Sequence, residues 1–419
     1  MHRKEVFPNG LTILTEEMPN LRSVTLGVWL KQGSRHEEPD ENGVSHFIEH
    51  LLFKGTEKRT SAEIARTIDA IGGQCDAFTS KEYTCFYARV LDDHLPVAVD
   101  LLSDIVLHPR FDPQNIEKER QVIFEEIKMV EDSPDELVYD LFTQTFWQAH
   151  PLGRPIQGTV ESVTALGTVQ LMKYFKEAYN PGSVVIAAAG NLKHERFLDD
   201  IHKAFAGMPA NGGGRTVNPP RAHGGIVTRE KKDLEQLHLC LGVEAYRQGH
   251  DDRYAGYLMN TILGGTMSSR LFQRIREERG LAYTVFSSIN SFLDTGYLMI
   301  YAATRPGGGH EVVKRVCDEL SLLKEMSISD AELRAAKDHL KGSLMLSLES
   351  SSSRMSNLAR QDIYYDRQFS LDEIADGIES VTRDDVLRLS RTLLMPDRCT
   401  LAVLGNLSQF DVTPDRIRF

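Results

Sequence analysis

The sequence predicts an α+β protein of two duplicated domains, each a mostly antiparallel sheet with helices packed on one face. Three observations lead to this fold class. The chain has 419 residues, which is more than one ordinary hydrophobic core accommodates. Similar segments occur in the same order in both halves. Strand patterns such as those within 75–91 are separated by turns rather than by full helices, which favours antiparallel pairing.

A segment rich in glycine and proline divides the chain nearly in half. Residues 207–225 read GMPANGGGRTVNPPRAHGG and have no apolar periodicity, as expected of a linker. We therefore predict an N-terminal domain over 1–206 and a homologous C-terminal domain over 226–419. Each domain closes with a buried strand that ends in Gly-Asn, within 183–192 and 399–407.

Other segments repeat in the same order. They include apolar strands that lead toward a helix, and long helices that begin with an aspartate in the first turn. A repeat of about 200 residues is too long for a solenoid and indicates a domain duplication. The matched segments are 23–34 with 237–246, 50–56 with 260–266, and 111–133 with 328–350.

Composition excludes several classes of protein. The hydrophobic content of 41% and the charged content of 26% are typical of a soluble globular chain. A net charge of −12 argues against nucleic acid or an anionic membrane as a partner. No apolar window is long enough to span a membrane, and the N-terminus shows no export signal. The five cysteines are odd in number and lack a C-x-x-C pair, so we expect a cytoplasmic protein.

The segment 43–56, GVSHFIEHLLFKGT, sets His46, Glu49 and His50 into the middle of an apolar helical pattern. His46 and His50 are four residues apart and share one helix face, with Glu49 beside them. Imidazole pairs at this spacing suit zinc, which prefers four ligands. H-x-x-E-H is the inverse of the H-E-x-x-H metalloprotease helix, and its glutamate is placed to activate a metal-bound water. The alternative is two core histidines that happen to lie near a glutamate.

A catalytic zinc site needs a third protein ligand and an open position. The apolar residues of 115–130 mark the buried face of a second helix, and Glu119 and Glu126 fall inside that apolar stripe. Together with Glu49, these carboxylates would repel one another in a low-dielectric interior. A divalent cation would reverse the sign of that interaction.

The second half lacks this set of residues. A requirement of the fold should appear in both copies, so the histidines and glutamates of the first half are interpreted as functional. At the positions that match His46, Glu49, His50, Glu119 and Glu126, the second half has Gly256, Met259, Asn260, Ala336 and Ser343.

With these residues the chain resembles the pitrilysin/insulinase superfamily of zinc peptidases, and most of all its short two-domain members related to mitochondrial processing peptidase. The most specific feature is H-x-x-E-H followed by a glutamate in an E-E-I context, and Glu126 follows His50 by 76 residues. The resemblance implies one zinc ion per chain, held by His46, His50 and Glu126. It also implies Glu49 as the general base and Glu119 as a supporting carboxylate.

The segment 274–283, RIREERGLAY, carries a second feature of the superfamily. The resemblance implies that Arg276 and Tyr283 are brought to the active site. There a guanidinium and a phenol hold the substrate carbonyl and stabilise the oxyanion. The alternative is that Arg276 forms a surface salt bridge and that Tyr283 is a core residue.

The strand within 75–81 matches the exposed edge that pairs with an extended substrate in the superfamily. Many members have asparagine where this chain has Asp76, which affects hydrogen bonds near the substrate rather than the metal site. The residues that the resemblance assigns to this edge are Asp76, Ala77, Phe78 and Thr79.

The expected function is that of a zinc metalloendopeptidase that acts on peptides or unfolded polypeptides in an enclosed chamber. In the resembling enzymes two such two-domain units enclose the chamber, so a homodimer is the simplest assembly and a heterodimer an alternative. A noncatalytic scaffold or partner subunit of the same fold is the alternative function. A serine nucleophile is not supported, because the chain has no G-x-S-x-G elbow.

Overall fold

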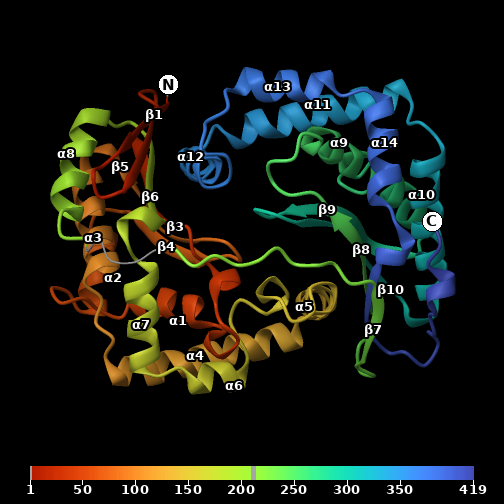
Figure 1. Ribbon diagram of the computed structural model, residues 1–419, viewed down its shortest axis with the longest axis horizontal. Helices are drawn as coiled ribbons and strands as arrows, with labels where there is room; N and C mark the ends of the chain where they lie inside the picture. Colours follow the sequence, from red (N-terminus) through yellow and green to blue (C-terminus); the bar gives the residue numbers. More distant parts are fainter. Residues whose placement is uncertain (1, 209–213) are drawn as a thin grey trace. The chain divides into compact units, whose positions relative to one another are not determined.

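The structure, a computed structural model, describes residues 2–208 and 214–419, so residues 209–213 of the predicted linker lie outside the described residues. The chain forms two compact units, each built from three segments (Figure 1). Unit 1 consists of Met1–Lys128, Arg154–Asn218 and Ser347–Gln368. Unit 2 consists of Met129–Gly153, Pro219–Leu346 and Phe369–Phe419.

Unit 1 contains a six-stranded sheet with the order β1-β2-β6-β3-β5-β4. Strands β2 and β6 pair in parallel, and the other neighbours are antiparallel. Strand β4 therefore lies at one edge. The strands are β1 (His2–Val6), β2 (Thr12–Glu17), β3 (Ser23–Leu30), β4 (Gln74–Thr79), β5 (Thr84–Leu91) and β6 (Val184–Gly190).

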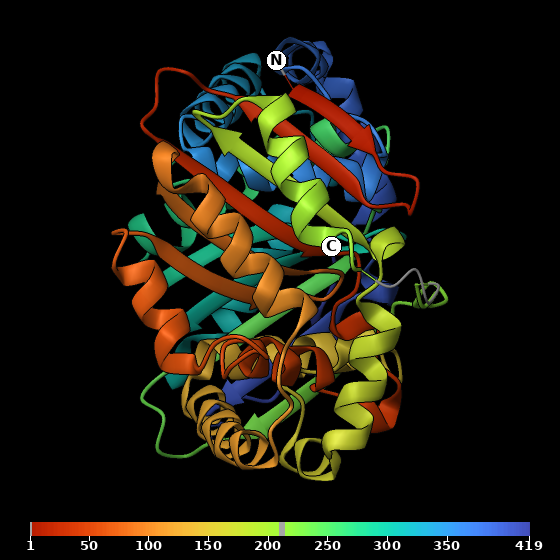
Figure 2. The same ribbon diagram turned by 90° about the vertical axis from the view of Figure 1, so that its left-hand side faces the viewer.

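One face of this sheet packs against most helices of unit 1. Apolar side chains from these helices and from alternate strand positions form a single core. Helices α3 and α8 lie across the strands (Figure 2). The helices that contribute to this core are α1 (Val44–Leu52), α2 (Ser61–Asp69), α3 (Leu95–Leu107), α4 (Pro113–Asp132), α6 (Val160–Ala165), α7 (Thr168–Ala178) and α8 (His194–Phe205).

Unit 2 repeats this plan with a five-stranded sheet of order β7-β11-β8-β10-β9. Strands β7 and β11 are parallel, and the other pairs are antiparallel. The strands are β7 (Gly225–Glu230), β8 (Leu237–Ala245), β9 (Ala282–Ser291), β10 (Gly296–Thr304) and β11 (Thr400–Gly405). The helices on the main core face are α9 (Arg253–Leu263), α10 (Gly309–Glu325), α11 (Asp330–Ser347), α13 (Leu371–Ser380) and α14 (Arg383–Leu393).

The predicted fold class is confirmed, and the structure adds one helix on the second face of each sheet. Helix α12 (Ser351–Tyr365) packs on β2, β3 and β6 in unit 1, and α5 (Pro134–Phe146) packs on β7, β8 and β11 in unit 2. Every residue of β6 and of β11 is buried, as expected of strands covered on both faces. The two compact units therefore differ from the predicted domains, which were the continuous ranges 1–206 and 226–419. Each unit includes one helix from the other half of the sequence, α12 in unit 1 and α5 in unit 2.

A duplicated glycine makes room for each of these helices. A Cβ atom on Gly27 of β3 would lie 2.6 Å from the sulfur of Met355 in α12. A Cβ atom on Gly242 of β8 would lie 2.5 Å from the ring of Phe142 in α5. Both glycines stand in the tripeptide Leu-Gly-Val of the matched strand segments. The duplication thus extends to the contact between each sheet and its second-face helix.

Within the described residues, no helix has the length and apolar character needed to cross a bilayer.

Candidate metal centre

Helix α1 begins where a buried carboxylate meets its first turn. Its N-cap, Gly43, has a φ of 96°, which glycine adopts without a steric penalty. The two carboxylate oxygens of Glu37 accept hydrogen bonds from the backbone N–H groups of Gly43 at 2.8 Å and Ser45 at 2.9 Å. The side chain of Asn42 donates a third bond at 3.1 Å. Burial raises the pKa of Glu37 to about 6 in spite of these bonds. The start of the nine-residue helix is therefore fixed by a carboxylate at its positive end.

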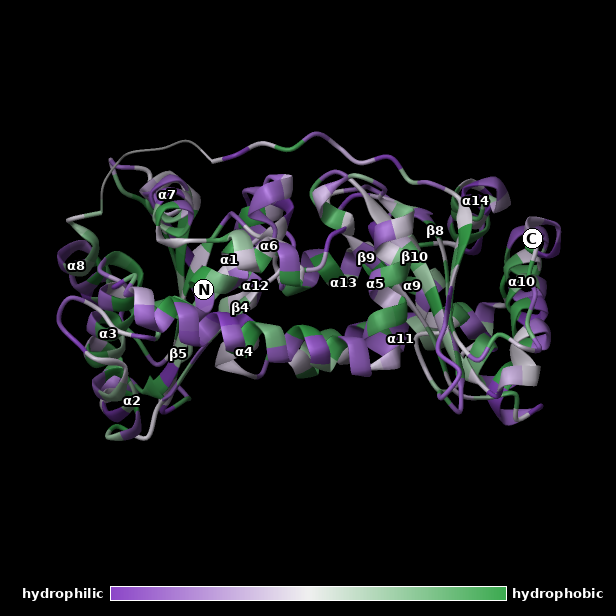
Figure 3. Ribbon diagram, turned by 90° about the horizontal axis from the view of Figure 1, so that it is seen from below, coloured by the Kyte–Doolittle hydropathy of each residue, from purple (hydrophilic) through white to green (hydrophobic). Residues whose placement is uncertain are grey.

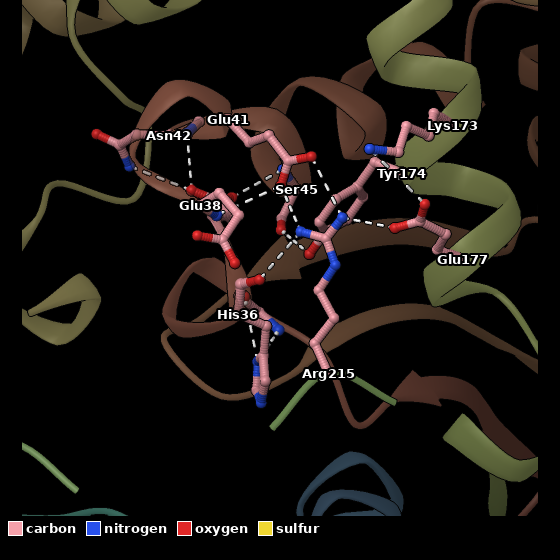
Figure 4. A network of polar contacts seen from close by, with 12 residues as sticks. His36, Glu38, Glu41, Asn42, Ser45, Lys173, Tyr174, Glu177 and Arg215 are labelled. Carbon is pink, nitrogen blue, oxygen red and sulfur yellow. Dashed lines mark hydrogen bonds and ion pairs between the residues drawn. The ribbon is translucent and has the colours of Figure 1, made fainter. Parts of the chain in front are cut away.

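A second network ties the loop before α1 to α7 (Figure 4). Arg215 donates to both carboxylate oxygens of Glu41 and, at 2.6 Å, to Glu177 of α7. Its guanidinium lies 5.1 Å from the ring centroid of Tyr174, whose hydroxyl lies 2.9 Å from the hydroxyl of Ser45. Burial by itself raises the pKa of Glu41, but the hydrogen bonds and positive charge of Arg215, together with a backbone hydrogen bond from Glu38, outweigh burial and lower the pKa. An arginine within the predicted linker thus anchors the segment that leads into α1.

The three predicted metal ligands come together in unit 1. His46 and His50 project from α1 with ring centroids 4.6 Å apart, and Glu126 projects from α4. The Nε2 atoms of the two rings each lie 3.6 Å from a carboxylate oxygen of Glu126, His46 facing Oε2 and His50 facing Oε1. One ligand atom from each residue lies within 4.8 Å of the other two. The two helices therefore converge on a common point.

This donor set fits a zinc ion. Two atoms that are each about 2.0–2.1 Å from a tetrahedral zinc lie about 3.4 Å apart, close to the observed N···O separations of 3.6 Å. Burial, and to a smaller extent the neighbouring His50, lowers the pKa of His46 to about 3, so its imidazole is neutral at pH 7. Two imidazoles and one carboxylate leave one position of a four-coordinate ion open.

Glu49 lies beside the histidines and contacts the edge strand. The hydroxyl of Thr79, the last residue of β4, donates to Oε2 of Glu49 at 2.5 Å. Burial raises the pKa of this glutamate. Along β4, exposed and partly buried residues alternate, and Phe78 packs edge-on against Trp29 with ring centroids 5.6 Å apart. Asp76 accepts a hydrogen bond from the backbone N–H of Ala77 at 2.8 Å. The predicted edge residues thus lie on an edge strand, and their part in substrate binding stays a prediction.

Glu119 supports His50 from α4. Its Oε2 accepts from Nδ1 of His50 at 3.2 Å, and its Oε1 lies 3.0 Å from Nζ of Lys54. Hydrophilic and hydrophobic residues alternate along α4 (Figure 3), and Glu119 is on the side that faces the core, with its side chain 8% exposed. A carboxylate on the second nitrogen of a metal-binding histidine is a common arrangement in zinc proteins.

Arg276 and Tyr283 are neighbours in unit 2. Arg276 lies in a π-helical turn, Phe272–Glu277, and its guanidinium carbon is 4.7 Å from the ring centroid of Phe272 and 4.9 Å from that of Tyr283. Tyr283 is 74% exposed, so the part of the alternative that made it a core residue is wrong. The other part is confirmed, because Nε of Arg276 lies 3.7 Å from Oε1 of Glu277 in a surface ion pair. The structure brings this predicted pair together through a cation–π contact.

Comparison with known proteins identifies the family. The family model for insulinase (peptidase family M16) matches residues 12–160. A second family model, for the peptidase M16 inactive domain, matches residues 169–340. The chain belongs to peptidase family M16. The second match covers much of the half that lacks the histidines and glutamates, as expected from the duplication.

Curated M16 relatives extend over nearly the whole chain. The uncharacterized zinc protease YmxG of Bacillus subtilis is 43% identical over 397 residues, which are 95% of this chain and 97% of that protein. The uncharacterized zinc protease SCO5738 of Streptomyces coelicolor is 41% identical over 416 residues, which are 97% of this chain and 90% of that protein. These matches confirm the predicted superfamily.

Solved structures show the same M16 fold. A protease from Helicobacter pylori has a TM-score of 0.91 at 21% identity and covers 97% of this chain and 99% of its own. A peptidase M16 inactive domain from Pseudomonas fluorescens has a TM-score of 0.90 at 22% identity, with coverage of 97% and 98%. At such identities the likeness concerns the fold alone.

Sequence reasoning missed several residues around this M16 site. Glu37 precedes the helix by too many residues to be read as a cap, and Arg215 lies in a segment read only as a linker. The hydrogen bond from Thr79 to Glu49 joins a strand and a helix whose separation along the chain gives no hint of contact. For Lys54 the sequence does contain a signal. The matched position in the second half is Gly264, so the lysine, like the histidines and glutamates, is present in the first half and absent from the second.

Proposed function

We propose that this M16 peptidase is a zinc-dependent metalloendopeptidase that hydrolyses peptides or unfolded segments of polypeptides in an enclosed chamber. The observation that carries the proposal is the convergence of ligand atoms of His46, His50 and Glu126 within 4.8 Å of one another. Glu49 lies on α1, the short helix that also carries the two histidines. The names of the curated relatives, zinc proteases, agree with it.

In this proposal one zinc ion per chain is held by His46, His50 and Glu126. A zinc ion bound there supplies Lewis acidity and lowers the pKa of water toward neutrality. The second nitrogen of His50 donates to Glu119, which fixes the orientation of the ring.

The remaining residues act on the water and on the peptide. Glu49 takes a proton from the attacking water and gives it to the leaving amine, so it has to exist in both protonation states. Its burial raises its pKa and stabilises the protonated form that this transfer needs. The peptide adds as a strand to the edge of β4, where main-chain pairing accepts many sequences. Arg276 and Tyr283 hold the carbonyl and stabilise the oxyanion.

We further propose that the chamber is completed by a second chain, most simply a second copy of this one, with a heterodimer as the alternative. Folded proteins would then be excluded, while short or extended peptides would enter. The same proposal includes a cytoplasmic location, in line with five free cysteines. Light scattering at working concentration tests the assembly, because a strict monomer contradicts it.

Metal analysis combined with a cleavage assay tests the function. We expect the purified protein to contain one equivalent of zinc, to cleave an unstructured peptide, to lose this activity on chelation, and to regain it when zinc is added. A protein that neither binds zinc nor cleaves unstructured peptides would instead be the noncatalytic subunit considered above. A protein that cleaves peptides with undiminished rate after complete removal of metal would rule out the zinc mechanism.

A further inference from the structure

Lys54 lies just beyond the end of α1 and contacts the carboxylate behind the metal site. We propose that Lys54 is a positioning residue of the metal centre, which holds Glu119 in place so that Glu119 orients His50. This inference rests on the zinc site proposed above. It extends that site by one residue that does not touch the metal ion or the substrate.

The contacts form a continuous chain from the lysine to the metal ligands. Nζ of Lys54 lies 3.0 Å from Oε1 of Glu119, and Oε2 of the same carboxylate lies 3.2 Å from Nδ1 of His50. The opposite nitrogen of that ring, Nε2, faces Glu126 at 3.6 Å. Because each oxygen of Glu119 has its own partner, rotation of the carboxylate would break one contact or the other. The carboxylate is therefore fixed in the plane that suits His50.

The backbone of Lys54 is fixed as well. Its N–H donates to the carbonyl of Leu51 at 2.9 Å, which continues the last turn of α1. Its carbonyl accepts from the side chain of Asn115 at 3.1 Å, and Asn115 lies one turn before Glu119 on α4. Lys54 thus contacts α4 at two points, one turn apart. It joins the helix that carries the two histidines to the helix that carries the carboxylates.

Charge gives the second reason. The side chain of Glu119 is only 8% exposed, and Glu49 and Glu126 lie in the same region of unit 1. An ionised carboxylate in such surroundings is stable only with a positive partner or with strong hydrogen bonds. The ammonium of Lys54, 34% exposed, supplies the positive charge without competing for the metal ligands. His50 can then donate its Nδ1 proton to Glu119 and keep Nε2 for the ion.

The duplicated half provides an internal comparison. Lys54, Glu119 and His50 are replaced there by Gly264, Ala336 and Asn260. At Gly264 a Cβ atom would meet the backbone nitrogen of Ser287 at 2.5 Å, so this position admits no larger side chain. Helix α9 ends there without any lysine. A lysine is therefore not needed to end a helix at this position of the fold. Lys54 occurs in the half of the chain that also has Glu119 and His50.

A simpler role for Lys54 is a favourable interaction with the negative end of the α1 dipole. The two roles differ in one respect, because the dipole interaction does not depend on Glu119. A double-mutant cycle between Lys54 and Glu119 separates them.

The experiment measures zinc affinity on metal-free protein, by competition with a chromophoric chelator. The variants are Lys54→Met, Lys54→Arg, Glu119→Gln and the double variant Lys54→Met/Glu119→Gln. Lys118→Met serves as a matched control, since Lys118 is exposed on the same helix as Glu119. Thermal unfolding of each metal-free variant establishes that it folds.

We expect Lys54→Met to weaken zinc binding about tenfold, within the range known for residues behind metal ligands. Lys54→Arg should restore the affinity to within about threefold, because a guanidinium also pairs with a carboxylate. In the Glu119→Gln background the lysine change should have no further effect. Lys118→Met should bind zinc as the unchanged protein does.

Two results would overturn the proposal. One is a Lys54→Met variant that folds and binds zinc as the unchanged protein does. The other is a Lys54→Met effect that persists in full when Glu119 is glutamine, which would indicate the dipole role. Both differ from failure of the zinc site itself, in which the unchanged protein would bind no zinc.

Discussion

The hydroxyl of Thr79 at the end of β4 lies 2.5 Å from a carboxylate oxygen of Glu49 on α1. The strand proposed to bind the peptide and the glutamate proposed to move protons are therefore joined by one hydrogen bond. Thr79→Val removes the hydroxyl and keeps the shape of the side chain, which suits a strand. Because a hydrogen bond to a charged group contributes roughly 1.5–3 kcal/mol, we expect kcat/KM to fall roughly ten- to hundredfold.

Zinc content and Thr79→Ser are the controls for this prediction. The serine variant keeps the hydroxyl and should retain most of the activity, while both variants should bind zinc as the unchanged protein does. A valine variant with undiminished kcat/KM would mean that the bond from Thr79 does not position Glu49 for the reaction.

Replacement of Glu49 should separate metal binding from hydrolysis. Glu49→Gln preserves size and removes the proton acceptor, so we expect kcat to fall by a factor on the order of 10²–10⁴ while one equivalent of zinc remains bound. Glu125→Gln is the matched control, because Glu125 is exposed on α4 and pairs with Lys128. Peptide cleavage at an undiminished rate in the Glu49 variant would exclude it as the general base.

Protonation of Glu37 should affect stability in weakly acidic solution. Burial raises the pKa of this carboxyl from 4.5 to about 6, so between these values the folded protein binds more protons there than the unfolded chain does. The contribution is fully present below pH 4.5 and is lost as the pH rises through 6. Over this window the free energy of unfolding of metal-free protein, relative to Glu37→Gln, should fall by an amount on the order of 2 kcal/mol.

This measurement can be confined to unit 1. The chain has two tryptophans, so Trp147→Phe leaves Trp29, which is buried in the sheet of unit 1, as the fluorescent reporter. Denaturant unfolding of both proteins in this background, at several pH values from 4 to 7, gives the difference directly. A difference that is constant with pH, or that rises with it, would contradict the assignment.

The sequence was sufficient where a pattern is local and periodic. The four-residue spacing of His46 and His50 and the stripe that holds Glu119 and Glu126 follow from helical geometry, and the structure brings His46, His50 and Glu126 within 4.8 Å of one another. The mostly antiparallel sheets followed from strand pairs separated by turns.

The positions of α5 and α12 could not be predicted in the same way. Each of these helices packs on the sheet formed by the other half of the sequence. An amphipathic helix shows that it has a buried face but not which sheet covers that face. The duplicated glycines Gly27 and Gly242 marked the places of close contact, yet in a sequence a glycine is equally consistent with a turn or a bulge. The contact of Lys54 with Glu119 is similar, because it depends on how two helices are packed together.

The last prediction concerns Arg215. This residue follows α8 in the sequence and connects that part of unit 1 to the loop before α1. Its guanidinium binds Glu41 through two nitrogens and also binds Glu177, and its side chain is only 22% exposed. Removing it leaves Glu41, whose side chain is 11% exposed, without its cation. Since an exposed ion pair contributes up to about 1 kcal/mol and loss of one partner of a buried pair costs about 3–5, we expect Arg215→Met to destabilise unit 1 by about 1–3 kcal/mol. Arg215→Lys should recover only part of this stability, because one ammonium cannot replace the planar guanidinium that spans both glutamates.

Denaturant unfolding followed by Trp29 fluorescence measures the effect of the Arg215 changes. The control is Arg221→Met, since Arg221 is an exposed arginine farther along the linker. Equal stability of the Arg215 and Arg221 variants would mean that the start of α1 is held by Glu37 alone.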